Sequence, residues 1–234
     1  MRYRKVIPGR FISRPDRFTA IVTVGGSEEK VHVKNTGRCR ELLLPDASVY
    51  LAEADNPDRK TRYDLIAVEK VLDDGSKILI NMDSQAPNKA AGEWLRSGGL
   101  FGEGASVRSE VRYRDSRFDF YIEQGERRIF LEVKGVTLER EGVAMFPDAP
   151  TERGLKHVRE LAECINEGYE AYVLFVIQMK GMHLFRPNHA THPQFGEALA
   201  EAQRRGVNIA AYDCIVEPDS MTIDQPADTA LEQL

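Results

Sequence analysis

The feature that most constrains the fold of this chain is a change in its apolar pattern near residue 82. Before that point, short β-rich segments such as 18–24 and 30–34 alternate with turns, which is typical of a small barrel or sandwich. Beyond it, strand-like segments alternate with amphipathic helical stretches, which is typical of a sheet covered by helices. The sequence therefore predicts an OB-like β-barrel domain over residues 1–82 and an α/β domain over residues 83–234.

The second half divides into elements by the periodicity of its apolar residues. The expected helices are 86–95, 151–167 and 194–205, and the expected strands are 107–112, 117–123, 128–134, 171–177 and 207–216. We expect Thr151 to cap the start of its helix and Gly168 to end it. The segment 171–177 is apolar throughout, which predicts a strand buried on both faces. The polar tail from Glu217 is expected to be loose.

Composition limits the class of protein. Hydrophobic residues make up 42% of the 234 positions and charged residues 29%, which excludes a mostly disordered chain. The longest apolar run, 171–177, is far shorter than the ~20 residues of a membrane span, and no signal-peptide apolar region follows the basic start. Three cysteines without metal-ligand spacing argue against a disulfide framework or a zinc site. We therefore expect a soluble, cytoplasmic protein that does not bind membranes.

Positive charge is concentrated at the start of the chain. Residues 1–40 hold ten Lys and Arg against three acids, although the formal net charge of the whole chain is −5. A local basic block suits contact with a polyanion, and the alternative is a solvated basic face. The segment 35–38 adds an amide, backbone N–H groups and a guanidinium, a suitable set for phosphate, unless it is only a turn with Gly37 at positive φ. The candidate nucleic-acid contacts here are Arg10, Arg14, Arg17, Lys34, Asn35 and Arg38.

Two expected neighbouring strands carry acids that could hold a metal ion. Side chains alternate along a strand, so Glu132 and Lys134 share one face, and Asp119 one hairpin earlier can lie beside Glu132. Two carboxylates that close repel each other unless a cation lies between them, and Mg²⁺ or Mn²⁺ suits such a pair. Lys134 could then activate a water molecule or stabilise phosphoryl charge, and Glu110 is a candidate third acid. The alternative explanation of Glu-x-Lys is a salt bridge at a strand edge.

The start of the helix at 151–167 offers a second set of phosphate contacts. Arg153, Lys156 and His157 lie in its first turns, where free backbone N–H groups carry partial positive charge. They could receive a phosphate near the acids, or they could simply be polar positions facing solvent.

The second half of the chain resembles the PD-(D/E)XK nuclease core, in which an acid is followed by Glu-x-Lys on the next strand and then by an amphipathic helix. Several longer motifs resemble the sugar fermentation stimulation protein A (SfsA) family: 35–38, 41–43, 131–138, 145–149, 151–157, 174–178 and 185–188. The resemblance implies an OB-like domain followed by a nuclease-like mixed sheet with flanking helices. It also implies DNA binding and a link to regulation of sugar (maltose) metabolism, and it leaves catalysis open.

Three functions follow as hypotheses. The first is a protein that binds DNA, with RNA as a second candidate, and has a Mg²⁺-dependent phosphodiesterase site formed by Asp119, Glu132 and Lys134. The second is a DNA-binding regulator that keeps the nuclease-like fold without cutting, and the third is an enzyme acting on a small phosphorylated or nucleotide substrate. The absence of a helix-turn-helix or zinc-finger motif argues against direct base readout. The sequence does not indicate an oligomeric state.

Overall fold

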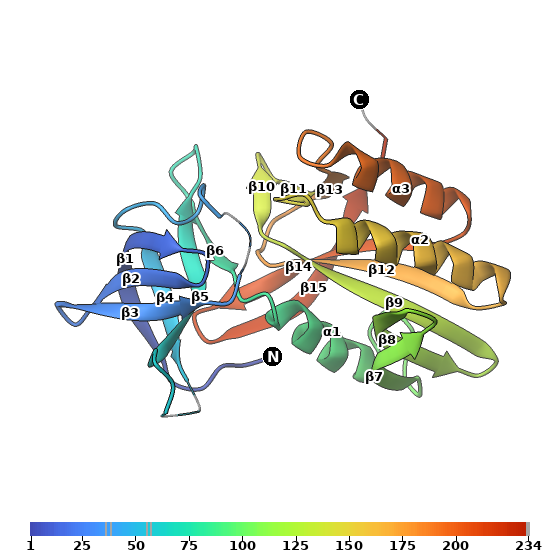
Figure 1. Cartoon of the computed structure of the whole chain (residues 1–234), viewed down its shortest axis with the longest axis horizontal. Coiled ribbons are helices and arrows are strands. Elements are labelled where there is room, and N and C mark those ends of the chain that lie inside the picture. Colours follow the sequence, from blue (N-terminus) through green and yellow to red (C-terminus); the bar gives the residue numbers. More distant parts are fainter. Residues whose placement is uncertain (36, 38, 55, 57, 233–234) are drawn as a thin grey trace.

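The computed structural model describes residues 1–35, 37, 39–54, 56 and 58–232. A barrel formed by the first part of the chain lies beside a larger part in which helices cover both faces of a sheet (Figure 1). The elements of the barrel are β1 (Val6–Asp16), β2 (Thr19–Val24), β3 (Ser27–Val33), β4 (Ser48–Glu53), β5 (Tyr63–Val71) and β6 (Lys77–Asn81). Those of the second part are α1 (Ala86–Arg96), β7 (Ser106–Tyr113), β8 (Ser116–Gln124), β9 (Arg127–Val136), β10 (Leu138–Arg140), β11 (Val143–Phe146), α2 (Glu152–Asn166), β12 (Glu170–Ile177), β13 (Leu184–Pro187), α3 (Pro193–Arg204), β14 (Asn208–Glu217) and β15 (Ser220–Thr229).

The first sheet closes on itself. Its strands follow the order β3-β2-β1-β4-β5-β6, and β3 also pairs in parallel with β5, so five strands form a ring. Closure removes exposed strand edges. The inward side chains that fill the ring include Val22, Val31 and Leu65, all of which are fully buried.

Local residue chemistry explains the tight hairpin between β2 and β3. Gly25 and Gly26 both have positive φ, at 56° and 87°. A two-residue turn with positive φ at both positions matches the twist of paired strands, and glycine adopts it without steric cost.

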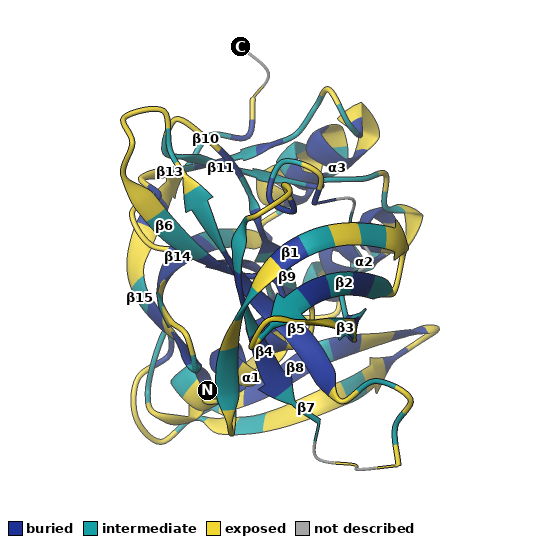
Figure 2. Cartoon of the chain, turned by 90° about the vertical axis from the view of Figure 1, so that its left-hand side faces the viewer, coloured by how far each residue is buried: buried dark blue, intermediate teal, exposed yellow. Residues whose placement is uncertain are grey.

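The second sheet has nine strands in the order β10-β11-β13-β15-β14-β12-β9-β8-β7. Strand β12 lies between β9 and β14 and is parallel to both, and its residues 173–177 are fully buried, as predicted. Residues of α1 pack with Leu131 and Val133 on one face, while residues of α2 and α3 pack with Val173 and Phe175 on the other. Figure 2 shows the outcome, with exposed residues concentrated in turns and on outer strands such as β7.

The boundaries of α2 agree with the expected capping. Thr151 Oγ1 accepts a hydrogen bond from the Gly154 amide at 3.1 Å, and Gly168 follows the helix with φ 79°. A side-chain acceptor at the N-terminus and a left-handed glycine past the C-terminus satisfy backbone groups that the helix itself leaves unpaired.

The fold class predicted from the sequence, a β-barrel followed by a mixed sheet with flanking helices, is confirmed. One expectation is wrong: the tail from Glu217 is not loose. It forms β15, which pairs with β14 and β13 in the interior of the sheet. Only a few of its side chains are apolar and buried, among them Met221 and Ile223, so its apolar pattern is weak. Within the described residues, no helix has the length and apolar content needed to cross a membrane.

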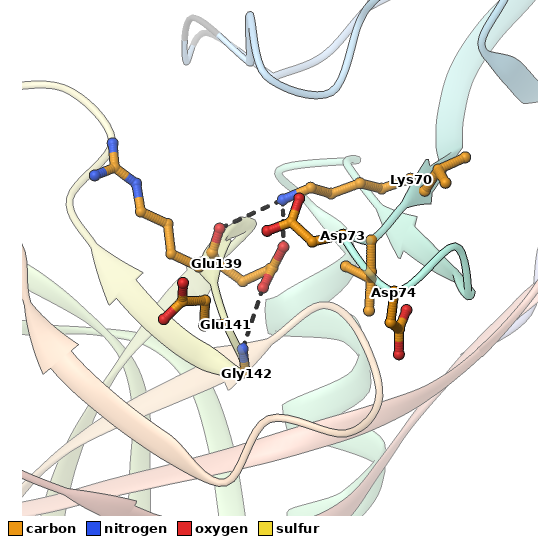
Figure 3. A pocket seen from close by; sticks show the side chains of 9 residues that line it. Lys70, Asp73, Asp74, Glu139, Glu141 and Gly142 are labelled. Carbon is orange, nitrogen blue, oxygen red and sulfur yellow. Dashed lines mark hydrogen bonds and ion pairs between the residues drawn. The ribbon is translucent and has the colours of Figure 1, made fainter.

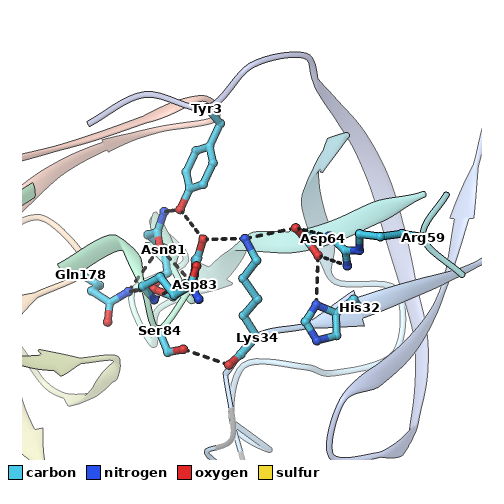
Figure 4. A network of polar contacts seen from close by, with 10 residues as sticks. Tyr3, His32, Lys34, Arg59, Asp64, Asn81, Asp83, Ser84 and Gln178 are labelled. Carbon is cyan, nitrogen blue, oxygen red and sulfur yellow. Dashed lines mark hydrogen bonds and ion pairs between the residues drawn. The ribbon is translucent and has the colours of Figure 1, made fainter. Parts of the chain in front are cut away.

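A polar network lies where the barrel meets the second part (Figure 4). Lys34 Nζ lies 3.1 Å from Asp64 Oδ2 and 3.3 Å from Asp83 Oδ2. The Tyr3 hydroxyl donates to the same Asp83 oxygen at 3.2 Å. Asp64 and Asp83 are both buried, so Lys34 compensates two carboxylates that water reaches poorly.

The same network fixes the connection between β6 and α1. Gln178, at the end of β12, donates from Nε2 to the Asn81 carbonyl at 2.9 Å and to the Asp83 carbonyl at 3.2 Å. The Asn81 amide in turn donates to the Gln178 carbonyl, and the Gln178 amide donates to the Val136 carbonyl, both at 2.9 Å. The connection is thus tied to the centre of the second sheet.

The network predicts a pH dependence of stability. Burial acts to raise the pKa of Asp64, but hydrogen bonds from Arg59 and His32 and the charge of Lys34 outweigh it and lower the pKa from 3.8 to about 2. A depressed folded-state pKa contributes stability above the unfolded value, and this contribution is lost as pH falls from about 4 to about 2. Compared with Asp64→Asn, the wild type should lose about 2 kcal/mol more unfolding free energy across this interval. Urea titrations at several pH values measure it, with the exposed Asp73→Asn as control.

If the pH dependence of Asp64→Asn matched that of the wild type and of Asp73→Asn, Asp64 would not be the titrating group.

A second contact between the two parts borders a pocket of about 500 Å³. Lys70 at the end of β5 pairs with the buried Glu139 of β10, whose other oxygen accepts from the Gly142 amide at 3.5 Å (Figure 3). The barrel is therefore joined to the second sheet on two sides, through Lys34 and through Lys70.

Candidate metal and phosphodiester site

Strands β8 and β9 bring the two predicted acids together. Their antiparallel pairing ends at Phe120 and Leu131, and Asp119, the preceding residue of β8, accepts from the Val133 amide of β9 through Oδ2 at 2.8 Å. Leu131 packs toward α1, so Glu132 and Lys134 lie on the opposite face, beneath α2. Glu132 and Lys134 thus lie next to the first turns of α2, and Asp119 lies on the neighbouring strand, where it also contacts Asn88 of α1.

Glu132 is buried, and only one of its two carboxylate oxygens has hydrogen-bond partners among the described residues. Its Oε1 accepts from Lys134 Nζ at 2.6 Å and lies 2.5 Å from His157 Nδ1. Its Oε2 is buried and has no hydrogen-bond partner within the described part of the chain. A buried carboxylate oxygen without a partner carries an uncompensated desolvation cost, so it is suited to accept a ligand.

Asp119 is held by two donors. Asn88 of α1 donates from Nδ2 to Oδ1 at 2.7 Å, and the Val133 amide donates to Oδ2 at 2.8 Å. Burial, followed by the nearby charge of Glu132, raises the pKa of Asp119 from 3.8 to about 6, although both hydrogen bonds and Lys134 act in the opposite direction. The charge of Glu132 thus adds to burial in opposing the ionisation of Asp119.

The pKa of Glu132 is shifted in the other direction. Burial acts to raise it, but the charge of Lys134 and the contact with His157 outweigh burial and hold it below its ordinary value. Near neutral pH, Glu132 is therefore ionised, and a neighbouring cation would also favour the ionised form of Asp119.

The donor chemistry fits a hard divalent cation. Asp119 and Glu132 supply carboxylate oxygens, the ligand type that Mg²⁺ and Mn²⁺ prefer. Among the described residues, no three side chains of His, Cys, Asp or Glu group into a metal-binding set. A cation here would take two carboxylates and complete its shell with water or phosphate oxygens, the usual arrangement for Mg²⁺.

His157 does not lie where the sequence analysis expected. It was a candidate phosphate contact on the helix surface, but it is buried and its ring bonds Glu132. The reason is helical periodicity, because His157 shares the buried face of α2 with Gly154, Leu155 and Val158. It positions the Glu132 carboxylate and does not reach solvent. Its place within an apolar stripe was a signal in the sequence that could have shown this.

Glu110 is not brought into contact with the other acids. Its side chain is exposed on the outer strand β7 and pairs with Arg117 at 3.4 Å. The residue has a positive φ of 56°, which interrupts the regular alternation of side chains along the strand. A third acidic ligand from Glu110 is therefore not present in this arrangement.

Asn88 is a site residue that sequence reasoning missed. It lies in the first turns of α1, whose helical nature was predicted, but nothing in the sequence indicated that this helix reaches Asp119. The link depends on the packing of α1 across β9, which is a tertiary contact.

The loop after β3 reaches the second part near α2. A Cβ atom on Gly37 would lie 2.0 Å from Asp148 Oδ2, in the turn ahead of α2, so a larger residue here would displace the Asp148 side chain. The close approach of the two segments, and not a positive φ, distinguishes Gly37. Arg14 donates to the carbonyls of Gly37 and Asn35 at 2.9 and 2.7 Å, and Asn35 Oδ1 accepts from the Gly37 amide at 2.7 Å. Arg14 and Asn35 therefore shape this loop, and Arg38 lies outside the described residues.

The remaining basic candidates differ in how accessible they are. Lys34 is half-buried between Asp64 and Asp83, so it is not positioned to neutralise a phosphate, contrary to expectation. Arg10 is exposed and donates to Asp46 O and Ser48 Oγ, both at 3.0 Å. Three candidates have side chains largely open to solvent: Arg17, Arg153 and Lys156, the last 3.6 Å from Glu160.

Two known protein-family models match this chain, one over each of its two parts. The model described as SfsA N-terminal OB domain matches residues 12–82, and the one described as sugar fermentation stimulation protein RE domain matches residues 85–220.

Individual relatives are similar over almost the whole length. A sugar fermentation stimulation protein homolog of Desulfitobacterium hafniense is 58% identical over 94% of each chain. One from Clostridium beijerinckii is 52% identical over 99% of this chain and 100% of its own. The solved structure of Pyrococcus furiosus SfsA in complex with Ca²⁺ is 27% identical, with a TM-score of 0.87 and 98% of both chains covered. The chain therefore belongs to the sugar fermentation stimulation protein (SfsA) family.

Proposed function

We propose that this protein binds nucleic acid and hydrolyses phosphodiester bonds with a divalent cation held by Asp119 and Glu132. The observation that carries the proposal is the buried Glu132 Oε2, which has no hydrogen-bond partner among the described residues, together with the nearby carboxylate of Asp119, whose pKa the charge of Glu132 helps to raise. Two adjacent acids and an orphaned oxygen are costly in a buried site, and a cation would relieve both costs.

Each residue of the site has a distinct part in this reaction. Asp119 and Glu132 would hold Mg²⁺ or Mn²⁺, which when bound polarises the phosphate and lowers the pKa of a water ligand. Lys134 Nζ, 2.6 Å from Glu132 Oε1, would stabilise the negative charge that develops on the phosphoryl group. Asn88 and His157 fix the orientation of the two carboxylates, as outer partners do in metal sites.

The barrel provides the surface that grips the nucleic-acid backbone in this proposal. The loop held by Arg14 contacts Asp148 just ahead of α2, the helix whose His157 bonds Glu132. Exposed Arg17, Arg153 and Lys156 supply charge for phosphate contacts. Support for a hard cation comes from the Pyrococcus furiosus relative, whose structure is described as a complex with Ca²⁺. A role in sugar metabolism is proposed from the names of the relatives.

The test is cleavage of labelled single-stranded and duplex DNA and RNA, with Mg²⁺, Mn²⁺ or EDTA. We expect products only with a divalent cation, none with Glu132→Ala or Lys134→Ala, and binding that weakens steeply with salt as counterions are released. Cleavage that persisted in both variants would exclude this site. A flat salt response would exclude nucleic acid as the ligand, and competition by mononucleotides but not oligonucleotides would indicate a small phosphorylated substrate.

One observation favours a second candidate, a DNA-binding regulator without catalysis. Lys134 and His157 already compensate one oxygen of Glu132, so the site is partly satisfied without a cation. This candidate predicts binding that survives EDTA and no cleavage with any metal.

A further inference from the structure

Phe18 differs from every other aromatic residue of the chain in its exposure. The chain has 10 Phe, 8 Tyr and 1 Trp, and all of them lie in the described part. Phe18 is 51% exposed, whereas the others are buried or half-buried. An exposed aromatic ring lacks the stabilisation that burial of its area would give. A role in binding would explain why Phe18 is exposed.

The ring is carried by a firmly fixed turn. Phe18 lies between β1 and β2, and its amide donates to Asp16 Oδ1 at 2.8 Å. Its carbonyl accepts from the Val33 amide of β3 at 2.8 Å. Arg14 donates to the neighbouring Arg17 carbonyl at 2.7 Å. The backbone at Phe18 is therefore held from three sides, and the ring is presented in advance of any ligand.

The surroundings of this turn favour a polyanion. Arg17 is exposed, and its side chain has no hydrogen bond or ion pair with the described residues. The guanidinium of Arg14 links the turn to the loop at Asn35 and Gly37, and that loop contacts Asp148 ahead of α2. The nearby acid Asp16 is engaged by the Phe18 amide. The ring thus lies beside a cationic side chain, on the part of the barrel connected to the candidate site.

A protein partner fits these observations less well. The other large exposed apolar side chains are Leu44, Val71 and Ile215, and they come from separate segments: a loop, the end of β5 and the strand β14. A stable protein interface buries ~800 Å² on each partner around a shared apolar centre, whereas one ring beside an arginine suits a single planar ligand.

We propose that Phe18 is a stacking platform for an unpaired base, so that the barrel binds single-stranded nucleic acid, with Arg17 on the adjoining phosphate. This inference rests on the proposed function and deepens it by naming the class of substrate. Stacking on an aromatic side chain tolerates any base, because each base has a π-face. In a duplex the bases are already stacked on each other, so the ring gains nothing there.

The test compares binding of fluorescein-labelled single-stranded oligo-dT and of a duplex, in EDTA so that no cleavage occurs. We expect Phe18→Ala to weaken binding of the single strand roughly 5- to 150-fold, the range that loss of one stacked base corresponds to, and to leave duplex binding within about twofold. Phe18→Tyr should restore single-strand binding. Leu44→Ala, an exposed apolar residue of the barrel at 55% exposure, is the matched control and should bind like the wild type.

A spectroscopic readout tests contact directly. In Phe18→Trp, with Trp94→Phe to remove the native tryptophan, oligo-dT should quench the indole fluorescence at saturation, because a stacked base lies against the ring. Absence of quenching, or equal weakening of single-strand and duplex binding by Phe18→Ala, overturns the platform. If the wild type binds oligonucleotides and cleaves them while Phe18→Ala behaves normally, only this inference fails. If the wild type binds no nucleic acid, both it and the proposed function fail.

Discussion

Glu132→Gln should reduce metal-dependent cleavage about a thousandfold, because a correctly placed cation supplies several kcal/mol of transition-state stabilisation, which equals about three powers of ten in rate. The substitution keeps the shape of the side chain and removes the charge that Oε2 presents. Affinity for Mn²⁺ should fall with it. Single-turnover cleavage measures the first effect and calorimetric titration with Mn²⁺ the second.

The matched control is Glu126→Gln, the same change at an exposed acid in the turn between β8 and β9. It should cleave and bind Mn²⁺ like the wild type. Thermal melting of both variants separates loss of the site from loss of the fold. Undiminished cleavage by a folded Glu132→Gln protein would show that the reaction occurs elsewhere.

Phe175→Ala should lower the unfolding free energy by about 3–5 kcal/mol, the usual cost of removing a buried phenyl ring. Phe175 is fully buried in β12, with its ring centroid 3.9 Å from that of Phe185 and 5.7 Å from that of Phe146. These rings fill the space between the sheet and the helices α2 and α3. Urea unfolding followed by circular dichroism measures the loss.

Phe18→Ala is the natural control, since it deletes the same side chain where it is 51% exposed. It should change stability by no more than ~0.5 kcal/mol, as is usual for surface positions. Similar losses in the two variants would contradict the assignment of Phe175 to the core.

The parts of the fold that the sequence predicted are those governed by local pattern. Residues 171–177 form a largely buried strand because a short apolar run rich in β-branched and aromatic residues suits a strand that is covered on both faces. Thr151 caps α2 because its hydroxyl can reach the Gly154 amide within the same turn. Glu132 and Lys134 share a face because side chains alternate along a strand. None of these requires knowledge of distant residues.

The parts that the sequence did not predict depend on tertiary contacts. Lys34, which follows β3 directly, was expected to contact phosphate, but it is paired with Asp64 of β5 and with Asp83, which lies in the other part of the chain. Asn88 reaches Asp119 only through the packing of α1. Strand β15 has few apolar side chains, and backbone pairing with β13 and β14 holds it in place.

The position of β15 has a consequence for biosynthesis. Among the described strands, β10, β11 and β13 pair with the rest of the nine-stranded sheet only through β15, which occupies residues 220–229. A ribosome completes the barrel sequence well before it reaches this segment. The barrel can therefore mature on the nascent chain, whereas the larger sheet keeps two open edges until its final strand has been synthesised and inserted. During that interval the unpaired strand edges are exposed and can pair with another polypeptide. Translation speed and chaperone binding therefore affect whether the sheet forms correctly.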